Sequence, residues 1–356
     1  MSDSFSEDYF QARERFLEAA RTVEARVDHL TLQACGPEDQ SLSIDIAWRG
    51  SITPRRVIVH QSGLHGVEGF AGSAIQLRLL TDPPAIDQDT ALVLVHILNP
   101  FGMAWLRRAN EHNVDLNRNC LNDGEPWQGA PQGYRRLNRL LNPPTPPGFD
   151  FFGLRAISGI LRHGFSTLKQ AVAAGQFDYP QGLFYGGAKL QQGPSLYQAW
   201  LSDHLGTARQ ILVIDVHTGL GRWAQETLFL EGSSPAKDSQ WLSQSLGKPL
   251  VGVQQGPTLG YEIRGGMSNL FGDLFKHAHG TYITQEFGTY PALKVIHALR
   301  EENRWQFFGQ GHPQHPVKQR LKRTMCPDSE RWRRRILDQG IALVENAIRN
   351  ANDTLP

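Results

Sequence analysis

One histidine and one glutamate in the first fifth of the chain have the spacing of metal ligands. His65 and Glu68 lie three positions apart in the glycine-rich segment 63–69. This spacing brings an imidazole and a carboxylate to one side of a single turn, where both reach the same cation, and the glycines let the backbone bend. The pair alone also fits a solvated turn, because tetrahedral zinc needs a third protein ligand in addition to these two.

A distant histidine is the candidate for that third ligand. His217 follows the apolar run 210–216, and His65 comes shortly after another β-branched run at 56–60. The carboxyl ends of parallel strands meet at one edge of a sheet, so we expect the two histidines to lie close together. Two histidines and one carboxylate, with water in the fourth position, are a ligand set of catalytic zinc. An isolated histidine at a strand end would instead be a hydrogen-bonded core residue.

The segment 107–119 concentrates cations, amides and an acid directly after an apolar run. It holds Arg107, Arg108, Asp115, Asn117 and Arg118. A guanidinium next to an amide is suited to binding a carboxylate through two hydrogen bonds. The simpler interpretation is a solvated polar loop.

A further carboxylate, Glu286, follows the strand-like run 281–284. At the edge of an apolar site its pKa would be raised, and it could act as a general base toward water. The simpler interpretation is an exposed acid at a strand end.

The elements that must position these residues alternate between strand and helix. Helical periodicity covers 5–29, 71–80 and 329–350, and strand-like runs cover 41–48, 56–60, 91–98, 210–216, 227–230 and 281–284. This alternation predicts an α/β fold in which helices cover both faces of a mixed, mostly parallel twisted sheet. We expect a single catalytic domain over 1–356. The alternation breaks down over 121–207, which predicts an inserted helical and loop region with two helices between about 150 and 179.

Composition and charge are ordinary for a soluble globular protein. Lys plus Arg (36) balance Asp plus Glu (35), which gives no reason to expect a nucleic-acid partner. No apolar run approaches the roughly 20 residues that cross a bilayer, and the N-terminus does not resemble a secretory signal. The three cysteines (Cys35, Cys120, Cys326) suit a reducing compartment, so we expect a cytoplasmic protein without a membrane partner. The basic run 318–335 predicts a solvated helix face or a contact within a homo-oligomer.

The segments that contain His65 and Glu68, residues 107–119, His217 and Glu286 follow one another along the chain. In this order they resemble the zinc carboxypeptidase family, the carboxypeptidase A-like metallopeptidases. The phrases SGLHGVEGFAGS, VDLNRN and EFGT resemble most a bacterial branch of it. The resemblance spans roughly 55–290, interrupted by 121–207. It implies a zinc carboxypeptidase-like fold and one zinc ion held by His65, Glu68 and His217. It also implies that Asp115 accepts the N–H of the first zinc histidine and so fixes its tautomer.

The resemblance assigns the other polar residues to catalysis and substrate binding. Glu286 matches the general base, and Arg108 matches the arginine that polarises the scissile carbonyl, with the adjacent Arg107 as an alternative. Asn117 and Arg118 match the pair that holds the substrate carboxylate.

The family also closes a mobile tyrosine on the substrate, shortly before the catalytic glutamate in sequence. Tyr261 lies in about the right interval, and Tyr185 in the 121–207 region is the alternative.

The activity expected from the resemblance is hydrolysis of an amide bond next to a free carboxylate, most simply by a metallocarboxypeptidase-type peptidase acting on peptides. The alternative is an N-acyl amino acid deacylase of the succinylglutamate desuccinylase/aspartoacylase type. A third hypothesis is a non-catalytic binding protein on the same scaffold.

Overall fold

The described residues of a computed structural model are 4–164, 174–231, 242–252, 263–309 and 311–350. They contain one eight-stranded sheet with the order β1-β2-β4-β3-β5-β8-β6-β7. Its strands are β1 (Arg26–Cys35), β2 (Ser41–Gly50), β3 (Arg56–Ser62), β4 (Thr90–His96), β5 (Gln210–Gly219), β6 (Glu226–Glu231), β7 (Leu250–Gly252) and β8 (His279–Gly288). The four central strands β4, β3, β5 and β8 run parallel, and antiparallel pairings join β2 to β1 and β4 and join β6 to β8. The predicted mixed, mostly parallel sheet is confirmed.

The central strands are apolar on both faces because helices cover both sides of the sheet. In β3, Ile58 packs into one hydrophobic core, while Val57 and Val59 pack into the other. Ile214 and Val213 of β5 divide between the two cores in the same way. Strands buried on both faces show continuous apolar runs, which is the pattern that identified them in the sequence.

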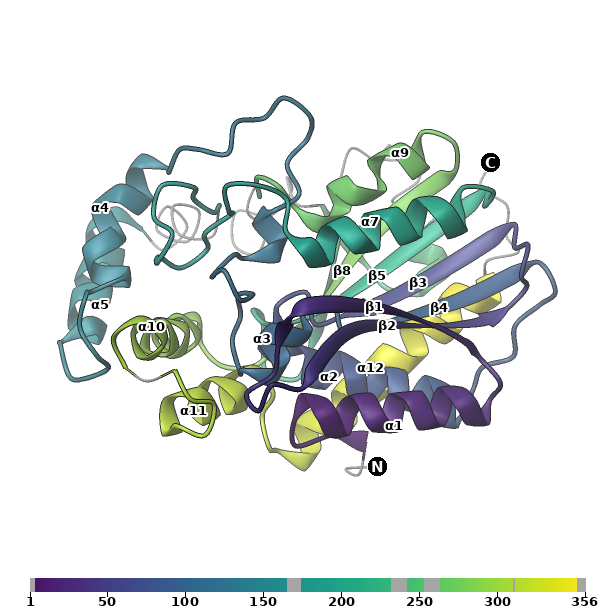
Figure 1. Ribbon diagram of the computed structural model, residues 1–356, viewed down its shortest axis with the longest axis horizontal. Coiled ribbons are helices and arrows are strands. Elements are labelled where there is room, and N and C mark those ends of the chain that lie inside the picture. The colour runs from purple at the N-terminus through teal and green to yellow at the C-terminus, as the bar shows by residue number, and fades with distance from the viewer. Residues whose placement is uncertain (1–3, 165–173, 232–241, 253–262, 310, 351–356) are drawn as a thin grey trace.

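The helices form two layers and one group beyond the end of the sheet (Figure 1). The helices α1 (Tyr9–Thr22), α2 (Gly69–Thr81) and α12 (Glu330–Arg349) cover one face, and α7 (Gln192–Leu205) and α9 (Gly272–Phe275) lie on the other. The group comprises α4 (Gln132–Leu141), α5 (Phe152–His163), α10 (Ala292–Phe308) and α11 (Pro316–Met325); α3 (Pro100–Ala104) lies close to the sheet. Three 3-10 turns, η2 (Gly66–Glu68), η3 (Leu116–Arg118) and η4 (Met267–Phe271), complete the described elements.

The predicted helix over 5–29 was wrong beyond Thr22. The helix α1 ends at Thr22, Glu24 adopts a left-handed φ of 53°, and the chain then forms β1. This strand is at the edge of the sheet, and Leu32 is its one buried hydrophobic residue. An edge strand that is largely exposed lacks the apolar pattern of a central strand, so its sequence signal is weak.

The region 121–207 contains α4, α5 and α7. Only the first of the two helices expected between 150 and 179 is described, as α5; the other expectation falls largely on 165–173, which lie outside the described residues. The hydroxyl of Tyr134 in α4 donates to the carbonyl of Leu183 (2.6 Å) and ties the start of the region to its later part. None of the described helices is long and apolar enough to span a bilayer.

Candidate metal centre

The carboxyl ends of three parallel strands bring the candidate residues together. His217 of β5 is the direct register partner of Glu286 of β8, and β3 on the other side of β5 leads into the loop with His65. This loop needs glycine, because a Cβ added at Gly66 would lie 2.2 Å from the carbonyl carbon of Gly102. The close contact with the segment around Gly102 fixes the turn that carries His65.

Three buried donor atoms meet at this edge. The Nδ1 atom of His65 lies 3.1 Å from Oε1 of Glu68, and Nδ1 of His217 lies 3.5 Å from Oε2 of the same carboxylate. The two Nδ1 atoms are 3.1 Å apart. Tetrahedral zinc with bonds of about 2.0–2.1 Å separates its ligand atoms by roughly 3.3 Å, so the donor set and its spacing fit this ion. The ligand atoms of His65, Glu68 and His217 all lie within 4.8 Å of one another. Among the described residues, they are the group of His, Cys, Asp or Glu side chains close enough to share one metal ion.

Each histidine has a carboxylate next to its other ring nitrogen. Nε2 of His65 is 3.2 Å from Oδ1 of Asp115, and Nε2 of His217 is 2.8 Å from Oδ2 of Asp215. Such partners orient the rings and leave Nδ1 to bind a cation. Asp115 was assigned this position from the sequence, but Asp215 was not. Its signal was available, because residues two apart on a strand face the same side.

Charges stabilise the ionised carboxylate of Glu68. Burial raises its pKa, but the charges of His65 and Arg108 and the hydrogen bonds with both histidines hold the pKa well below its usual range. The backbone N–H of Thr218 donates to Oε2 of Glu68 (3.1 Å). For His217, burial lowers the pKa, yet the carboxylates of Asp215 and Glu68 outweigh burial and raise the pKa well above its ordinary value. The site therefore favours positive charge at its centre.

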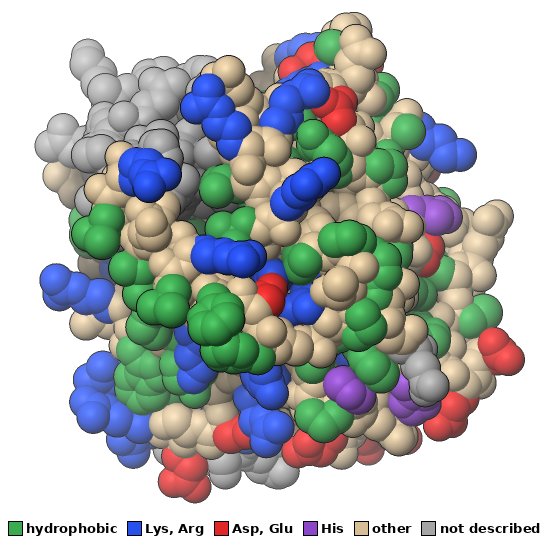
Figure 2. Space-filling model, turned by 90° about the vertical axis from the view of Figure 1, so that its left-hand side faces the viewer, with side chains coloured by type: hydrophobic (Ala, Val, Ile, Leu, Met, Phe, Trp, Pro, Cys, Tyr) green, Lys and Arg blue, Asp and Glu red, His purple; other side chains and the backbone are tan. Residues whose placement is uncertain are grey.

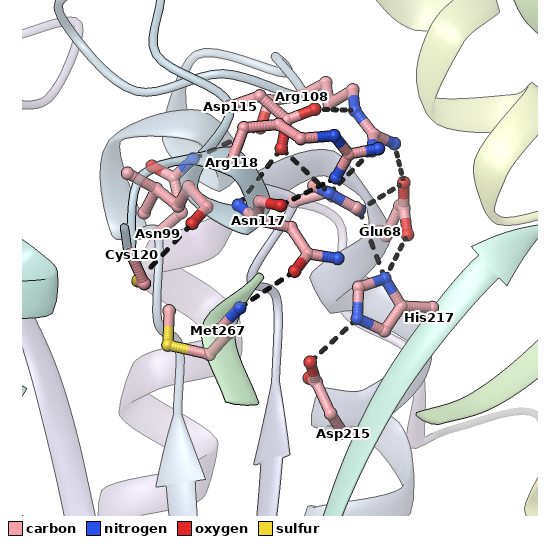
Figure 3. A network of polar contacts seen from close by, with 12 residues as sticks. Glu68, Asn99, Arg108, Asp115, Asn117, Arg118, Cys120, Asp215, His217 and Met267 are labelled. Carbon is pink, nitrogen blue, oxygen red and sulfur yellow. Dashed lines mark hydrogen bonds and ion pairs between the residues drawn. The ribbon is translucent and has the colours of Figure 1, made fainter. Parts of the chain in front are cut away.

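Arg108 lies against this cluster (Figure 3). Its Nη1 donates to Oε1 of Glu68 (2.9 Å), its Nε donates to Oδ2 of Asp115 (3.0 Å), and its Nη2 lies 2.6 Å from Nε2 of His65. The ring of Phe184 lies 5.2 Å from the guanidinium carbon. Arg108 thus has a fixed position at the metal-ligand cluster.

The alternative arginine faces elsewhere. Arg107 is buried, and it donates to Oε1 of Glu302 (2.9 Å) and to Oδ1 of Asn113 (2.8 Å). These contacts make Arg107 a structural residue, so Arg108 is the better candidate for polarising a carbonyl.

The proposed carboxylate-binding pair is divided between the cavity and its surroundings. Asn117 lines the cavity next to the cluster, and its Oδ1 accepts the N–H of Met267 (3.0 Å). Arg118 is fully buried, does not line that cavity, and donates from Nη1 to the carbonyl of Asn117 (2.7 Å). The charge of Arg118 is therefore buried beside the backbone of Asn117 and outside the lining of this cavity.

Glu286 faces the cluster from β8 and is 8% exposed. Its Oε1 accepts the N–H of Leu220 (2.8 Å). Burial and the nearby charge of Glu68 raise its pKa to about 7, although His217 opposes this shift. A carboxyl with a pKa near neutrality is suited to take up and release a proton at physiological pH.

The two candidate tyrosines differ in what the structure describes. Tyr261 lies outside the described residues. The side chain of Tyr185 is buried in one of the two hydrophobic cores, and its carbonyl accepts the N–H of Asp115 (2.7 Å). Its neighbour Phe184 lines the cavity instead.

One cavity adjoins the whole cluster. Its lining includes the three donor residues, Arg108, Asn117 and Glu286. On the face that carries α4, α5, α10 and α11, hydrophobic side chains surround a hollow in which acidic and basic groups are visible (Figure 2). Glu231 also lines this cavity, and the sequence gave no reason to single it out. Burial raises the pKa of Glu231, and its Oε1 accepts the hydroxyl of Thr284 (2.6 Å).

Comparisons with known proteins place this chain by family and by fold. A family model described as "Protein of unknown function (DUF2817)" matches residues 5–339. No curated protein matches the chain. The structure is similar to that of thrombin-activatable fibrinolysis inhibitor, with 9% sequence identity over 98% of this chain and 75% of that chain and a TM-score of 0.51. A carboxypeptidase A from Helicoverpa armigera is 14% identical over 92% of this chain and 76% of that chain, with a TM-score of 0.49. At such low identity, the first of these similarities shows a common fold.

Proposed function

Because the chain belongs to the family described as "Protein of unknown function (DUF2817)", we propose its function from the site itself. We propose a zinc-dependent hydrolase of metallocarboxypeptidase type that cleaves an amide bond next to a free carboxylate. The observation that carries this proposal is the register pairing of His217 with Glu286. It sets a buried carboxyl with a pKa of about 7 beside three clustered metal donors.

His65 and His217 would hold the zinc ion through Nδ1, and Glu68 would hold it through its carboxylate. Zinc at such a site acts as a Lewis acid toward a carbonyl and makes water more acidic. Asp115 and Asp215 keep the two imidazoles oriented, and the low pKa of Glu68 keeps its carboxylate ionised.

Glu286 carries the proton in this proposal. Its Oε1 is held by the N–H of Leu220, so Oε2 is the atom that takes a proton from the attacking water. The same carboxyl then delivers that proton to the leaving nitrogen, which departs as an amine. A general base of this kind contributes typically 10²–10⁴-fold to the rate.

Arg108 is placed to stabilise the negative charge that develops on the carbonyl oxygen. Its contacts with Glu68 and Asp115 fix the guanidinium before substrate binds, which avoids reorganisation during the reaction. Removing one donor of this kind typically costs roughly 3–4 kcal/mol of transition-state stabilisation.

Asn117 is the residue proposed to hold the substrate carboxylate. Its side chain lines the cavity, and the buried guanidinium of Arg118 donates to its backbone carbonyl. A positive charge at low dielectric attracts an anion without touching it. Binding the carboxylate in this place sets which amide bond reaches Arg108 and Glu286.

A non-catalytic binding protein would need no proton carrier at the cluster. A carboxyl buried at an energetic cost beside the metal donors favours an enzyme, because such perturbed groups are concentrated at active sites. Whether the substrate is a peptide or an N-acyl amino acid depends on what the cavity binds beyond Arg108.

The test is the Glu286→Gln variant, which retains the hydrogen-bond acceptor for Leu220 but cannot carry a proton. It should bind zinc as the wild type does and lose at least a hundredfold in turnover of C-terminal peptides or N-acyl amino acids. The matched control is Glu226→Gln, which changes a glutamate on neighbouring β6 that accepts from Gln285 (2.8 Å). Near-normal turnover by Glu286→Gln would overturn the proposal.

A further inference from the structure

The cavity next to the metal donors has one wall that the reaction described above does not use. Three helices outside the two layers of the fold, α4, α5 and α10, build this wall. They contribute mostly apolar side chains, among them Leu141, Phe152, Ala156, Ile160, Ile296 and Leu299. Among the described residues, Arg155 is the one ionisable group that these helices add to the lining.

Buried cations hold the wall in place. Arg300 of α10 is 1% exposed; its Nε donates to the carbonyl of Leu140 (2.7 Å), and its guanidinium pairs with Asp150. Arg304, one turn later, donates from Nε to the carbonyl of Thr145 (3.0 Å). These contacts tie the α4–α5 segment to a helix that follows directly on β8. The apolar wall is therefore built into the fold, as preformed ligand pockets usually are.

The apolar surface continues up to the groups that would act on the carbonyl. Phe184 packs on the guanidinium of Arg108. A Cβ added at Gly219 would lie 3.6 Å from Sδ of Met325, 3.8 Å from Cγ1 of Val295 and 3.9 Å from Oε1 of Glu286. Hydrophobic side chains therefore lie close to the carboxyl of Glu286.

The residue proposed to bind the carboxylate comes from a different wall. Asn117 lies on η3, which packs against η4, and not on any of the three helices. A substrate whose carboxylate is bound at Asn117 and whose carbonyl is at Arg108 would therefore extend its acyl part along the apolar wall.

We infer that the acyl part of the substrate is one large apolar group, an alkyl chain or aromatic group, so that N-acyl amino acids are the substrate class. This inference rests on the proposed function. None of the described lining residues from these three helices is acidic. The free amino group of a short peptide would therefore lose its hydration at this wall without a partner there and would face the like charge of Arg155, whereas an alkyl chain gains from burial. Hydrolysis breaks the C–N bond, joins the water oxygen to the acyl carbon and yields a fatty or aromatic acid and the free amino acid.

The test measures binding separately from turnover. N-acetyl-, N-hexanoyl- and N-dodecanoylglycine are titrated calorimetrically into zinc-loaded Glu286→Gln protein, with glycylglycine as the peptide probe. We expect the Kd to fall about fourfold for each added methylene until the wall is covered, and glycylglycine to bind no better than acetylglycine. Equal affinities for the three acyl chains would overturn the inference.

Two variants on α5 test where the chain binds. Ala156→Trp fills the cavity, whereas Leu154→Trp places the same side chain on the outer face, where Leu154 is 67% exposed. We expect Ala156→Trp to remove the dependence on chain length and Leu154→Trp to retain it. If Ala156→Trp does not fold, Ile160→Gln takes its place. This variant introduces a polar group into the wall at similar volume and should reduce the dependence of binding on chain length. Unchanged dependence in a folded wall variant would overturn the inference.

Turnover by the wild type separates this inference from the function on which it rests. Chain-length-dependent binding without hydrolysis of any acylglycine or peptide would support the apolar subsite and refute the hydrolase. If acetylglycine and C-terminal peptides are hydrolysed as fast as dodecanoylglycine and bind as tightly, the inference is overturned and the hydrolase is supported.

Discussion

Replacing Glu286 by glutamine should stabilise the metal-free protein above neutral pH. A pKa of about 7 in place of 4.5 means that the folded protein disfavours the ionised carboxylate. Relative to the unfolded chain, this is a cost of roughly 3 kcal/mol, because one pKa unit corresponds to about 1.4 kcal/mol. Glutamine has the same shape, keeps an acceptor for the N–H of Leu220 and carries no charge.

The sign of the effect with pH follows from proton binding. Between pH 4.5 and 7 the folded wild type binds more protons than the unfolded chain at Glu286, so its stability falls as the pH rises through this range. The difference between Glu286→Gln and wild type should therefore be near zero at pH 4, grow toward pH 7 and stay constant above it. At about 2.1 cal/mol/K per residue, roughly 3 kcal/mol corresponds to a rise in Tm on the order of 4 °C.

The assay is thermal unfolding in the presence of a chelator at several pH values. Glu302→Gln is the control, because it should change the stability in the opposite direction. Burial raises the pKa of Glu302, but the charges of Arg107 and Lys318 outweigh it and lower the pKa. Glu302→Gln should therefore be less stable than wild type at neutral pH, and the loss should shrink as the pH falls below the usual range of a glutamate. A Glu286→Gln variant that is no more stable than wild type at pH 8 would refute the account of this carboxyl.

Three further outcomes are expected. Asp215→Asn should weaken zinc binding roughly 10–100-fold in chelator competition, because Asp215 orients His217; unchanged affinity would remove Asp215 from the site. Asn117→Ala should raise KM on the order of 10–100-fold for substrates with a free carboxylate, but little for their amides; equal changes for both would contradict its assignment. The wild-type kcat/KM should fall about tenfold per pH unit on an acidic limb, because Glu286 must be deprotonated; bound zinc places this limb below the pKa of about 7 of the metal-free protein, and a flat profile down to pH 4 would exclude Glu286 as the base.

The sequence predicted the residues whose positions follow from local pattern and strand direction. The runs that became β3, β4 and β5 are buried on both faces, so their apolar sequences identified them. Because parallel strands end at one edge, His65, His217 and Glu286 could be expected to meet there, and the structure brings them together. Their functions as ligands and base remain predictions.

Features that depend on contacts distant in sequence were not predicted. The start of the edge strand β1 was assigned to a helix and the rest of it was not recognised, because an exposed strand leaves little pattern. The burial of Arg118 beside the backbone of Asn117 depends on how the loop packs, which no spacing encodes. The apolar wall forms because α5 packs against α10, more than a hundred residues later in the chain.

The zinc content of purified protein tests the central claim most directly. Wild type and a His65→Ala/His217→Ala variant are loaded with excess zinc, desalted and measured by inductively coupled plasma mass spectrometry against protein concentration. We expect about one tightly bound zinc per chain in the wild type and less than about a tenth of that in the variant, since one remaining carboxylate cannot hold the ion. Equal zinc in both proteins, or none in the wild type, would contradict the metal centre.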